Sequence, residues 1–193
     1  MTAPTTERAF EDAIAAHLTS HGWRLGDAST FDPVRGVFAE EFVAWVRESQ
    51  PEAWEALTRL HGDGGVAVRL VEALVAARAL RKTPELLRKG FDLSGTHIDV
   101  AVFPPSQGRN AEVLRRVAAG RLTVTRQVRF DPAGSDSVDL VLSLNGVPVA
   151  TAEIKVRTTG GHWQRAVEQY CARPTGVALF RFAAWRRGSR GAG

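Results

Sequence analysis

The chain has 193 residues, of which 44% are hydrophobic and 24% charged, a composition typical of one globular domain with a sizeable core. No run of 18 apolar residues occurs, and the polar N-terminus lacks the apolar core of a signal peptide, so we expect a cytoplasmic protein without a membrane span. The net charge of +4 divides into −6 over residues 1–63 and +10 over residues 64–193. The basic part suits a polyanion such as DNA, although a solvated surface would have the same composition.

The first ninety residues are predicted to be mainly helical. A helix over 5–21 is indicated by Phe10, Ile14 and Leu18 at helical spacing, with Gly22 at its end. Further helices are expected over 36–48, from Pro51 to about Gly62, over 65–81, and from Thr83 to Gly90.

Glu11 falls on the apolar face of the first predicted helix. A carboxylate there is costly unless it is paired or bound to metal; the alternative is an edge position that reaches water. His17 and His21 have a spacing that could suit a metal, but no third histidine or cysteine is evident nearby. The single Cys171 allows neither an internal disulfide nor a cysteine-based zinc site.

After residue 90 the hydrophobic period changes to that of strands. We expect a strand over 97–103, a helix from Asn110 to about Ala119, a strand over 122–130, a hairpin around Asn145-Gly146, and a helix over 163–171. On the strand 122–130, Leu122, Val124, Val128 and Phe130 are predicted to share a face. The fold class is therefore α+β, or α/β, with a mixed sheet flanked by helices and a helical N-terminal half.

We expect one domain over residues 1–180. It comprises a helical half, 1–90, and a sheet-bearing core, 91–180. The basic tail, 181–193, has no usable period.

The residues that could carry chemistry lie on the predicted hairpin. Asp139 is followed after thirteen residues by Glu153, and Lys155 stands two positions further on. Phosphodiester hydrolysis uses a divalent metal held by carboxylates, together with a cation that orients the attacking water. A lysine at position 155 is notable, because only three of the 25 basic residues of the chain are lysine and the others are arginine. The alternative is an exposed strand whose charged side chains form salt bridges.

Whether Asp139 shares a face with Glu153 and Lys155 depends on the turn. A two-residue Asn-Gly turn pairs Leu144 with Val147 and puts Asp139 opposite Ala152, on the wrong face. A nuclease site therefore requires a three-residue loop or a bulge elsewhere in the hairpin.

The segments TRQVRF, VDLVLSLNGVPVATAEIK and TGGHWQRAVEQY resemble the nuclease core of type I restriction enzyme motor subunits. The resemblance covers roughly residues 7–170. It implies a PD-(D/E)xK restriction-endonuclease-like fold with Asp139, Glu153 and Lys155 as catalytic residues. It further implies that Glu11 is an additional metal-site carboxylate and that Gln169 lies beside the site.

The chain departs from the family pattern at Val138, Ile154 and Val156, and the last of these loses a polar group near the site. The implied reaction is Mg²⁺-dependent cleavage of double-stranded DNA, with specificity and methyltransferase subunits as partners in the full enzyme.

Family members continue into an ATP-driven motor, but no GxxxxGK[ST] motif occurs in this sequence, so we expect a truncated chain without an ATP site. Two alternatives remain. One is an inactive remnant that only binds DNA or partner subunits, and the other is a nuclease that acts without a helicase in repair or defence.

Overall fold

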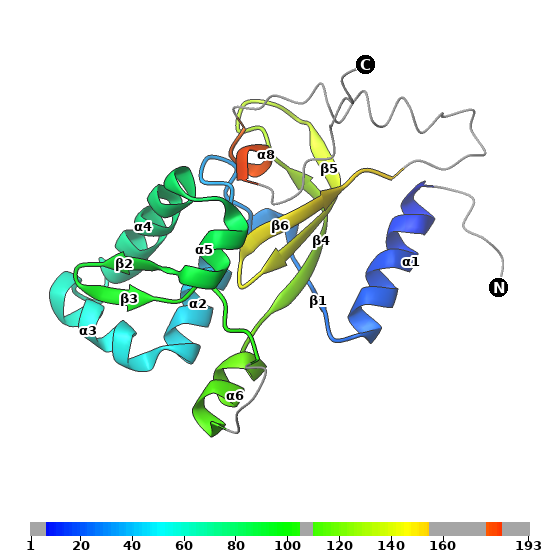
Figure 1. Ribbon diagram of the computed structural model, residues 1–193. Helices are drawn as coiled ribbons and strands as arrows, with labels where there is room; N and C mark the ends of the chain where they lie inside the picture. The colour runs from blue at the N-terminus through cyan, green and yellow to red at the C-terminus, as the bar shows by residue number, and fades with distance from the viewer. Residues whose placement is uncertain (1–6, 105–109, 155–176, 183–193) are drawn as a thin grey trace, which may run out of the picture.

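The structure, a computed structural model, describes residues 7–104, 110–154 and 177–182. A four-stranded mixed sheet lies at the centre, with α1 on one side and the helices α2–α5 on the other (Figure 1). This arrangement confirms the predicted α+β class with a mixed sheet flanked by helices. The predicted helix over 163–171 lies outside the described residues.

The helices follow the predicted order closely. Their bounds are α1 Glu7–Ser20, α2 Ala39–Ser49, α3 Pro51–His61, α4 Val66–Leu80, α5 Thr83–Lys89, α6 Ala111–Ala118 and α8 Ala178–Phe182, with a 3-10 turn η1 over Ala28–Thr30. Proline stands in the first turn of both α3 and α5, where its missing N–H has no helical partner. Asn110 caps α6 by accepting from the N–H groups of Glu112 and Val113, as its position predicts.

The central sheet has the order β1-β4-β5-β6. Its strands are β1 Arg24–Leu25, β4 Leu122–Arg129, β5 Ser137–Leu144 and β6 Val147–Ala152. β1 pairs parallel with β4, and the other neighbours pair antiparallel. A separate antiparallel hairpin joins β2, Phe91–Leu93, to β3, Thr96–Ile98.

The predicted strand over 97–103 is wrong beyond Ile98. The backbone there takes its hydrogen bonds from side chains instead of a partner strand. The Gln50 side chain accepts from the N–H of Asp99 and donates to its carbonyl oxygen, and Asn145 Nδ2 donates to the Val100 carbonyl. These contacts satisfy the backbone without a ladder, so the apolar alternation in sequence reflects burial of an irregular segment.

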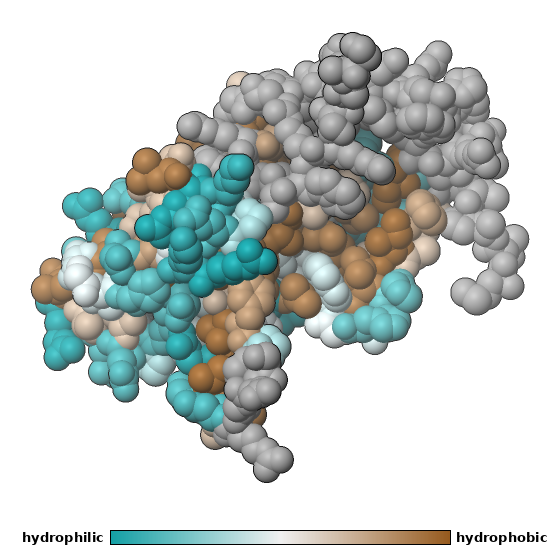
Figure 2. Space-filling model, in the orientation of Figure 1, coloured by the Kyte–Doolittle hydropathy of each residue, from teal (hydrophilic) through white to brown (hydrophobic). Residues whose placement is uncertain are grey.

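Three apolar clusters hold the elements together. The largest fills the space between α2, α3, α4, α5 and the β2–β3 hairpin, and it reaches the central sheet at Val147. A second joins α8 to the sheet, where the rings of Phe130 and Phe180 meet edge to face. A third packs α1 on the sheet through Ala15, Val124 and neighbours. On the face shown in Figure 2 the helical part is mainly polar outside, and apolar colour gathers over the sheet.

The turn of the β5–β6 hairpin is buried beneath the start of α2. Asn145 and Gly146 both have positive φ, 53° and 80°, which is the two-residue type I′ geometry. The carbonyl of Gly146 accepts from the N–H of Phe38, directly before α2. The hairpin is therefore anchored at its tip.

α8 ends at Phe182, so residues 181 and 182 of the predicted irregular tail are helical. The remainder of the tail lies outside the described residues. Within the described ranges no helix has the length and apolar character needed to cross a bilayer.

Candidate active site

The helix α1 brings Glu11 against the sheet. Its buried residues are Glu11 and Ala15, one turn apart, whereas Phe10 is 42% exposed, so the buried face is rotated from the predicted one. Glu11 is only 5% exposed, which excludes the alternative of an edge position that reaches water. Its Oε1 accepts a hydrogen bond of 3.0 Å from Gln127 Nε2 on β4.

Gln127 interrupts the regular geometry of β4. Its φ is 51°, in the left-handed region, although paired residues flank it on both sides: Arg126 with Leu140 and Val128 with Val138. The predicted shared face of β4 is therefore wrong. Val124 packs in the α1 cluster and Val128 in the α8 cluster, because the backbone turns between them at Gln127.

Asp139 stands across from Gln127 on β5, and its carboxylate is engaged on both oxygens. Oδ1 accepts from Gln127 Nε2 at 3.1 Å, and Oδ2 accepts from the backbone N–H of Ile154 at 2.6 Å. The same nitrogen of Gln127 thus reaches the carboxylates of both Glu11 and Asp139. Two residues 128 positions apart in the chain converge at one point.

The hairpin register brings Asp139 and Glu153 to matching positions. The turn has two residues, because Leu144 pairs with Val147, but the register shifts between Ser143 and Leu142. Ser143 pairs with Pro148 and Leu142 with Ala150, which leaves Val149 as an extra residue on β6.

Beyond this bulge the pairs run regularly to Leu140 with Ala152. The next position on each side is Asp139 and Glu153. Residues that stand opposite in an antiparallel pair point to one face. A bulge of this kind is what the predicted site requires, since a plain two-residue turn would place Asp139 opposite Ala152.

Glu153 follows β6 directly and is half-buried. Lys155 and Gln169, the other predicted catalytic residues, lie outside the described residues. Their roles, and the convergence of Lys155 with the carboxylates, stay predictions.

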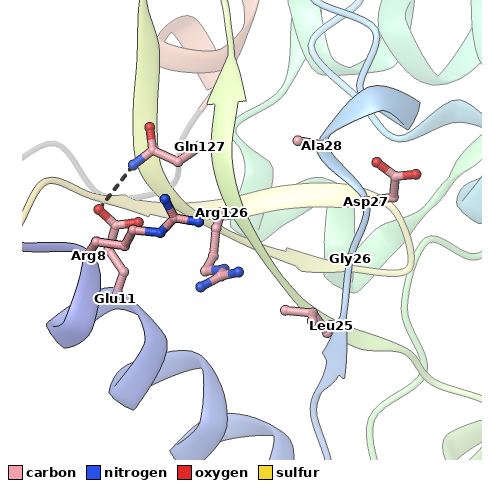
Figure 3. Close-up of a pocket in the computed structure, with 8 residues that line it drawn as sticks. All are labelled: Arg8, Glu11, Leu25, Gly26, Asp27, Ala28, Arg126 and Gln127. Atoms are coloured by element: carbon pink, nitrogen blue, oxygen red, sulfur yellow. Dashed lines mark hydrogen bonds between the residues drawn. The ribbon is translucent and has the colours of Figure 1, made fainter.

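A pocket of about 570 Å³ opens beside this cluster (Figure 3). It lies between α1, β4 and the segment after β1, and it is lined by Arg8, Glu11, Leu25, Gly26, Asp27, Ala28, Arg126 and Gln127. In Figure 3 the Glu11 and Gln127 side chains meet on one side of the pocket.

Opposite charges surround the pocket. Arg126 forms an ion pair with Asp12 of α1, and Arg8 is exposed on the same helix. Across the pocket, hydrogen bonds from the backbone N–H and hydroxyl of Ser29 hold the pKa of Asp27 below its usual value. The site therefore combines anchored carboxylates with two guanidinium groups.

Glycine at position 26 lets the chain after β1 pass close to β4. A Cβ there would lie 2.2 Å from Thr125 Oγ1 and 2.8 Å from Thr123 Cγ2. The wall of the pocket opposite α1 depends on this close approach.

Within residues 7–104, 110–154 and 177–182, no three His, Cys, Asp or Glu side chains form a group that could hold a metal ion. The rings of His17 and His21 lie 4.3 Å apart, but His21 Nδ1 is already within 2.7 Å of the His17 carbonyl oxygen. Mg²⁺ needs fewer protein ligands than such a group, because it commonly binds through one or two carboxylates and keeps several waters. Glu11 and Asp139, which reach one nitrogen between them, fit that smaller requirement.

Sequence reasoning missed Gln127. The residue belongs to the segment TRQVRF, but a glutamine at a polar position of a strand carries no signal of its own. Only the tertiary structure reveals its left-handed backbone and its contacts with residues from two other elements.

The chain matches a family model described as "Type I restriction enzyme R protein N terminus" over residues 4–186. The match covers most of the chain, which therefore belongs to this family. It extends beyond Tyr170, the limit of the resemblance recognised in the sequence. Comparisons with curated proteins and with solved structures found no match.

Proposed function

From its membership of the type I restriction enzyme R protein family, we propose that this chain is a Mg²⁺-dependent endonuclease domain of the PD-(D/E)xK type. Its reaction is hydrolysis of phosphodiester bonds in double-stranded DNA, in the cytoplasm. The observation that carries the proposal is the convergence of Glu11 and Asp139 on one nitrogen, with Glu153 at the matching position of the hairpin.

The carboxylates of Glu11 and Asp139 would hold Mg²⁺ directly, and Glu153 would contact one of the waters that Mg²⁺ keeps. When bound, the ion supplies a Lewis acid for the phosphate and a water of lowered pKa. Asp139 is fixed for this task, because its two oxygens accept from the Ile154 backbone and from Gln127. Glu11 is held in a buried position by the same amide.

Lys155 has the remaining role of orienting the attacking water and offsetting charge that develops on the phosphate. It follows Glu153 by two residues, a spacing that in an extended segment puts both side chains on one face. Gln169 would support the site, as the family resemblance implies.

The guanidinium groups of Arg8 and Arg126 suit the phosphates of the bound strand. Both line the pocket beside the carboxylates, and guanidinium groups bind phosphate oxygens through paired N–H donors. Arg126 would exchange Asp12 for a phosphate when DNA binds. In the full enzyme, specificity and methyltransferase subunits would choose the target, and a motor would drive ATP-dependent translocation.

The direct test is cleavage of supercoiled plasmid by the purified chain in Mg²⁺, with EDTA as the control. We expect the parent chain to give nicked and linear products with Mg²⁺ but not with EDTA. The variants Glu153→Ala and Glu11→Gln should fold but give neither product. Glu85→Gln is a matched control, because Glu85 is an exposed carboxylate on α5 that pairs with Lys89 and does not line the pocket.

Equal cleavage by the parent chain and Glu153→Ala would show that the carboxylates are structural. No cleavage by the parent, with DNA binding retained, would favour the alternative of an inactive remnant that only binds DNA or partner subunits.

A further inference from the structure

Gln127 holds a backbone conformation that a strand residue normally avoids. In the left-handed region an L-residue brings its Cβ close to the following carbonyl oxygen. The other non-glycine residues of the described chain with positive φ are Ser94 and Asn145, and both lie in hairpin turns. Gln127 alone of the three stands inside a strand. Strain of this kind persists where surrounding contacts impose it, and it is concentrated at functional sites.

The contacts that impose it are those of the Gln127 amide. Nε2 donates to Glu11 Oε1 at 3.0 Å and to Asp139 Oδ1 at 3.1 Å. On the other side, Oε1 accepts from Ser137 Oγ at 2.9 Å. One side chain therefore links α1, β4 and β5 at the point where the carboxylates meet.

The orientation of this amide follows from the chemistry of its partners. Ionised carboxylates can only accept hydrogen bonds, so they face the NH₂ group, which has two donors, one for each carboxylate. The hydroxyl of Ser137 can donate and therefore faces the amide oxygen.

We infer that Gln127 is a positioning residue that holds Glu11 and Asp139 in the arrangement required for a divalent cation. The inference rests on the proposed function, since it concerns the same metal site. It assigns to β4 a role that the catalytic motif on the hairpin does not include.

Two physical arguments connect the amide with cation binding. Like charges repel, so two carboxylates that approach each other separate unless a donor or a cation lies between them. An ionised carboxylate also offers about four lone-pair sites. Gln127 uses one on each carboxylate and the Ile154 N–H uses a second on Asp139, so lone pairs remain on both carboxylates for a cation. Hydrogen bonds that orient metal-ligating groups typically affect metal affinity by about 10- to 100-fold.

The experiment measures Mg²⁺ affinity by isothermal titration calorimetry, and the rise in melting temperature with Mg²⁺, on the full 193-residue chain. We expect Gln127→Met, which keeps the length of the side chain but removes its donors, to weaken Mg²⁺ binding by about 10- to 100-fold. Asp12→Asn is the matched control. It removes another polar link between α1 and β4, the ion pair with Arg126, and should leave Mg²⁺ affinity unchanged.

A second variant, Gln127→Lys, keeps the inference testable if Gln127→Met fails to fold. The lysine ammonium would lie between the two carboxylates in place of the amide. We expect this variant to fold without metal and to show no rise in melting temperature with Mg²⁺, because the ammonium competes for the carboxylates.

The outcomes separate this inference from the proposed function. If the parent chain shows neither binding heat nor a melting shift with Mg²⁺, the metal site itself fails, and the inference falls with it. If the parent binds Mg²⁺ and Gln127→Met binds it equally or more tightly, or if Gln127→Lys responds to Mg²⁺ as the parent does, the inference alone is overturned. An equal loss of affinity in Asp12→Asn would also overturn it, because any link between α1 and β4 would then suffice.

Discussion

Gly146, the second residue of the hairpin turn, is expected to be very sensitive to substitution by alanine. Its φ is 80°, and a Cβ would lie 2.5 Å from the carbonyl oxygen of Phe38 and 2.8 Å from the backbone nitrogen of Phe42. The left-handed conformation costs an L-residue about 1–2 kcal/mol. Because both contacted atoms are main chain at the start of α2, the helix or the hairpin must shift, at an overpacking cost of about 1–3 kcal/mol.

Together these terms lower the free energy of unfolding by about 2–5 kcal/mol for Gly146→Ala. In a domain of this size 1 kcal/mol corresponds to about 2–4 °C, so the melting temperature should fall by roughly 4–20 °C. Thermal and urea unfolding, followed by circular dichroism, measure both quantities.

Two other glycines separate the two contributions. Gly95 has a φ of 79°, but a Cβ at this position would have no neighbour within 4 Å, so Gly95→Ala should show only the conformational cost. Gly64 has neither a positive φ nor a close neighbour, so Gly64→Ala should leave the melting temperature almost unchanged. If Gly146→Ala loses no more stability than Gly95→Ala, the close packing of the turn against α2 does not anchor the hairpin.

Two further predictions concern charged groups. Lys155→Arg should lose most plasmid cleavage in Mg²⁺, because a guanidinium is planar, bulkier and differently hydrated; cleavage at the parental rate would show that any cation suffices. Burial raises the pKa of Glu41 despite the hydrogen bond from Thr123 Oγ1 and the charge of Arg121, so its contribution to stability is present at acid pH and is lost as pH rises through its folded-state pKa. The melting temperature of Glu41→Gln should therefore rise relative to that of the parent as the pH increases from acid to neutral. A difference that stays constant, or that changes in the opposite direction, would contradict this expectation.

The sequence predicts those parts of the fold that local chemistry determines. Proline in the first turn and glycine after the last residue define α3 and α5, and Asn145-Gly146 defines the hairpin turn. These signals depend on backbone geometry alone, so they do not require knowledge of the tertiary contacts.

The parts that the sequence did not predict depend on partners far away in the chain. β1 is only two residues long and exists because it pairs with β4, about a hundred positions later. The irregular segment after Ile98 is held by the side chains of Gln50 and Asn145. No local sequence pattern predicts either feature.

The candidate site shows the same division. The hairpin, the requirement that Asp139 and Glu153 share a face, and the apolar setting of Glu11 can be predicted from periodicity. The bulge at Val149 and the left-handed Gln127 are not, because each is a departure from the regular strand that the periodicity assumes. They lie on β6 and β4, the two strands that flank Asp139 on β5.

The last prediction concerns ATP. Nucleotide hydrolysis of the P-loop kind needs a glycine-rich loop between a strand and a helix, with a lysine on the β- and γ-phosphates and a hydroxyl for Mg²⁺. The glycine cluster HGDGGVAV at 61–68 lacks the lysine and the following Ser or Thr. In the structure these glycines separate two helices, since α3 ends at His61 and α4 begins at Val66, and Gly65 is packed against the His61 carbonyl. No strand leads into the loop, so the backbone N–H groups are not arranged around a phosphate.

We expect the purified 193-residue chain to show no ATPase activity and any DNA cleavage to be independent of ATP. A coupled phosphate-release assay with and without DNA, alongside plasmid cleavage with and without ATP, measures both, and DNA-stimulated ATP turnover would contradict this reasoning.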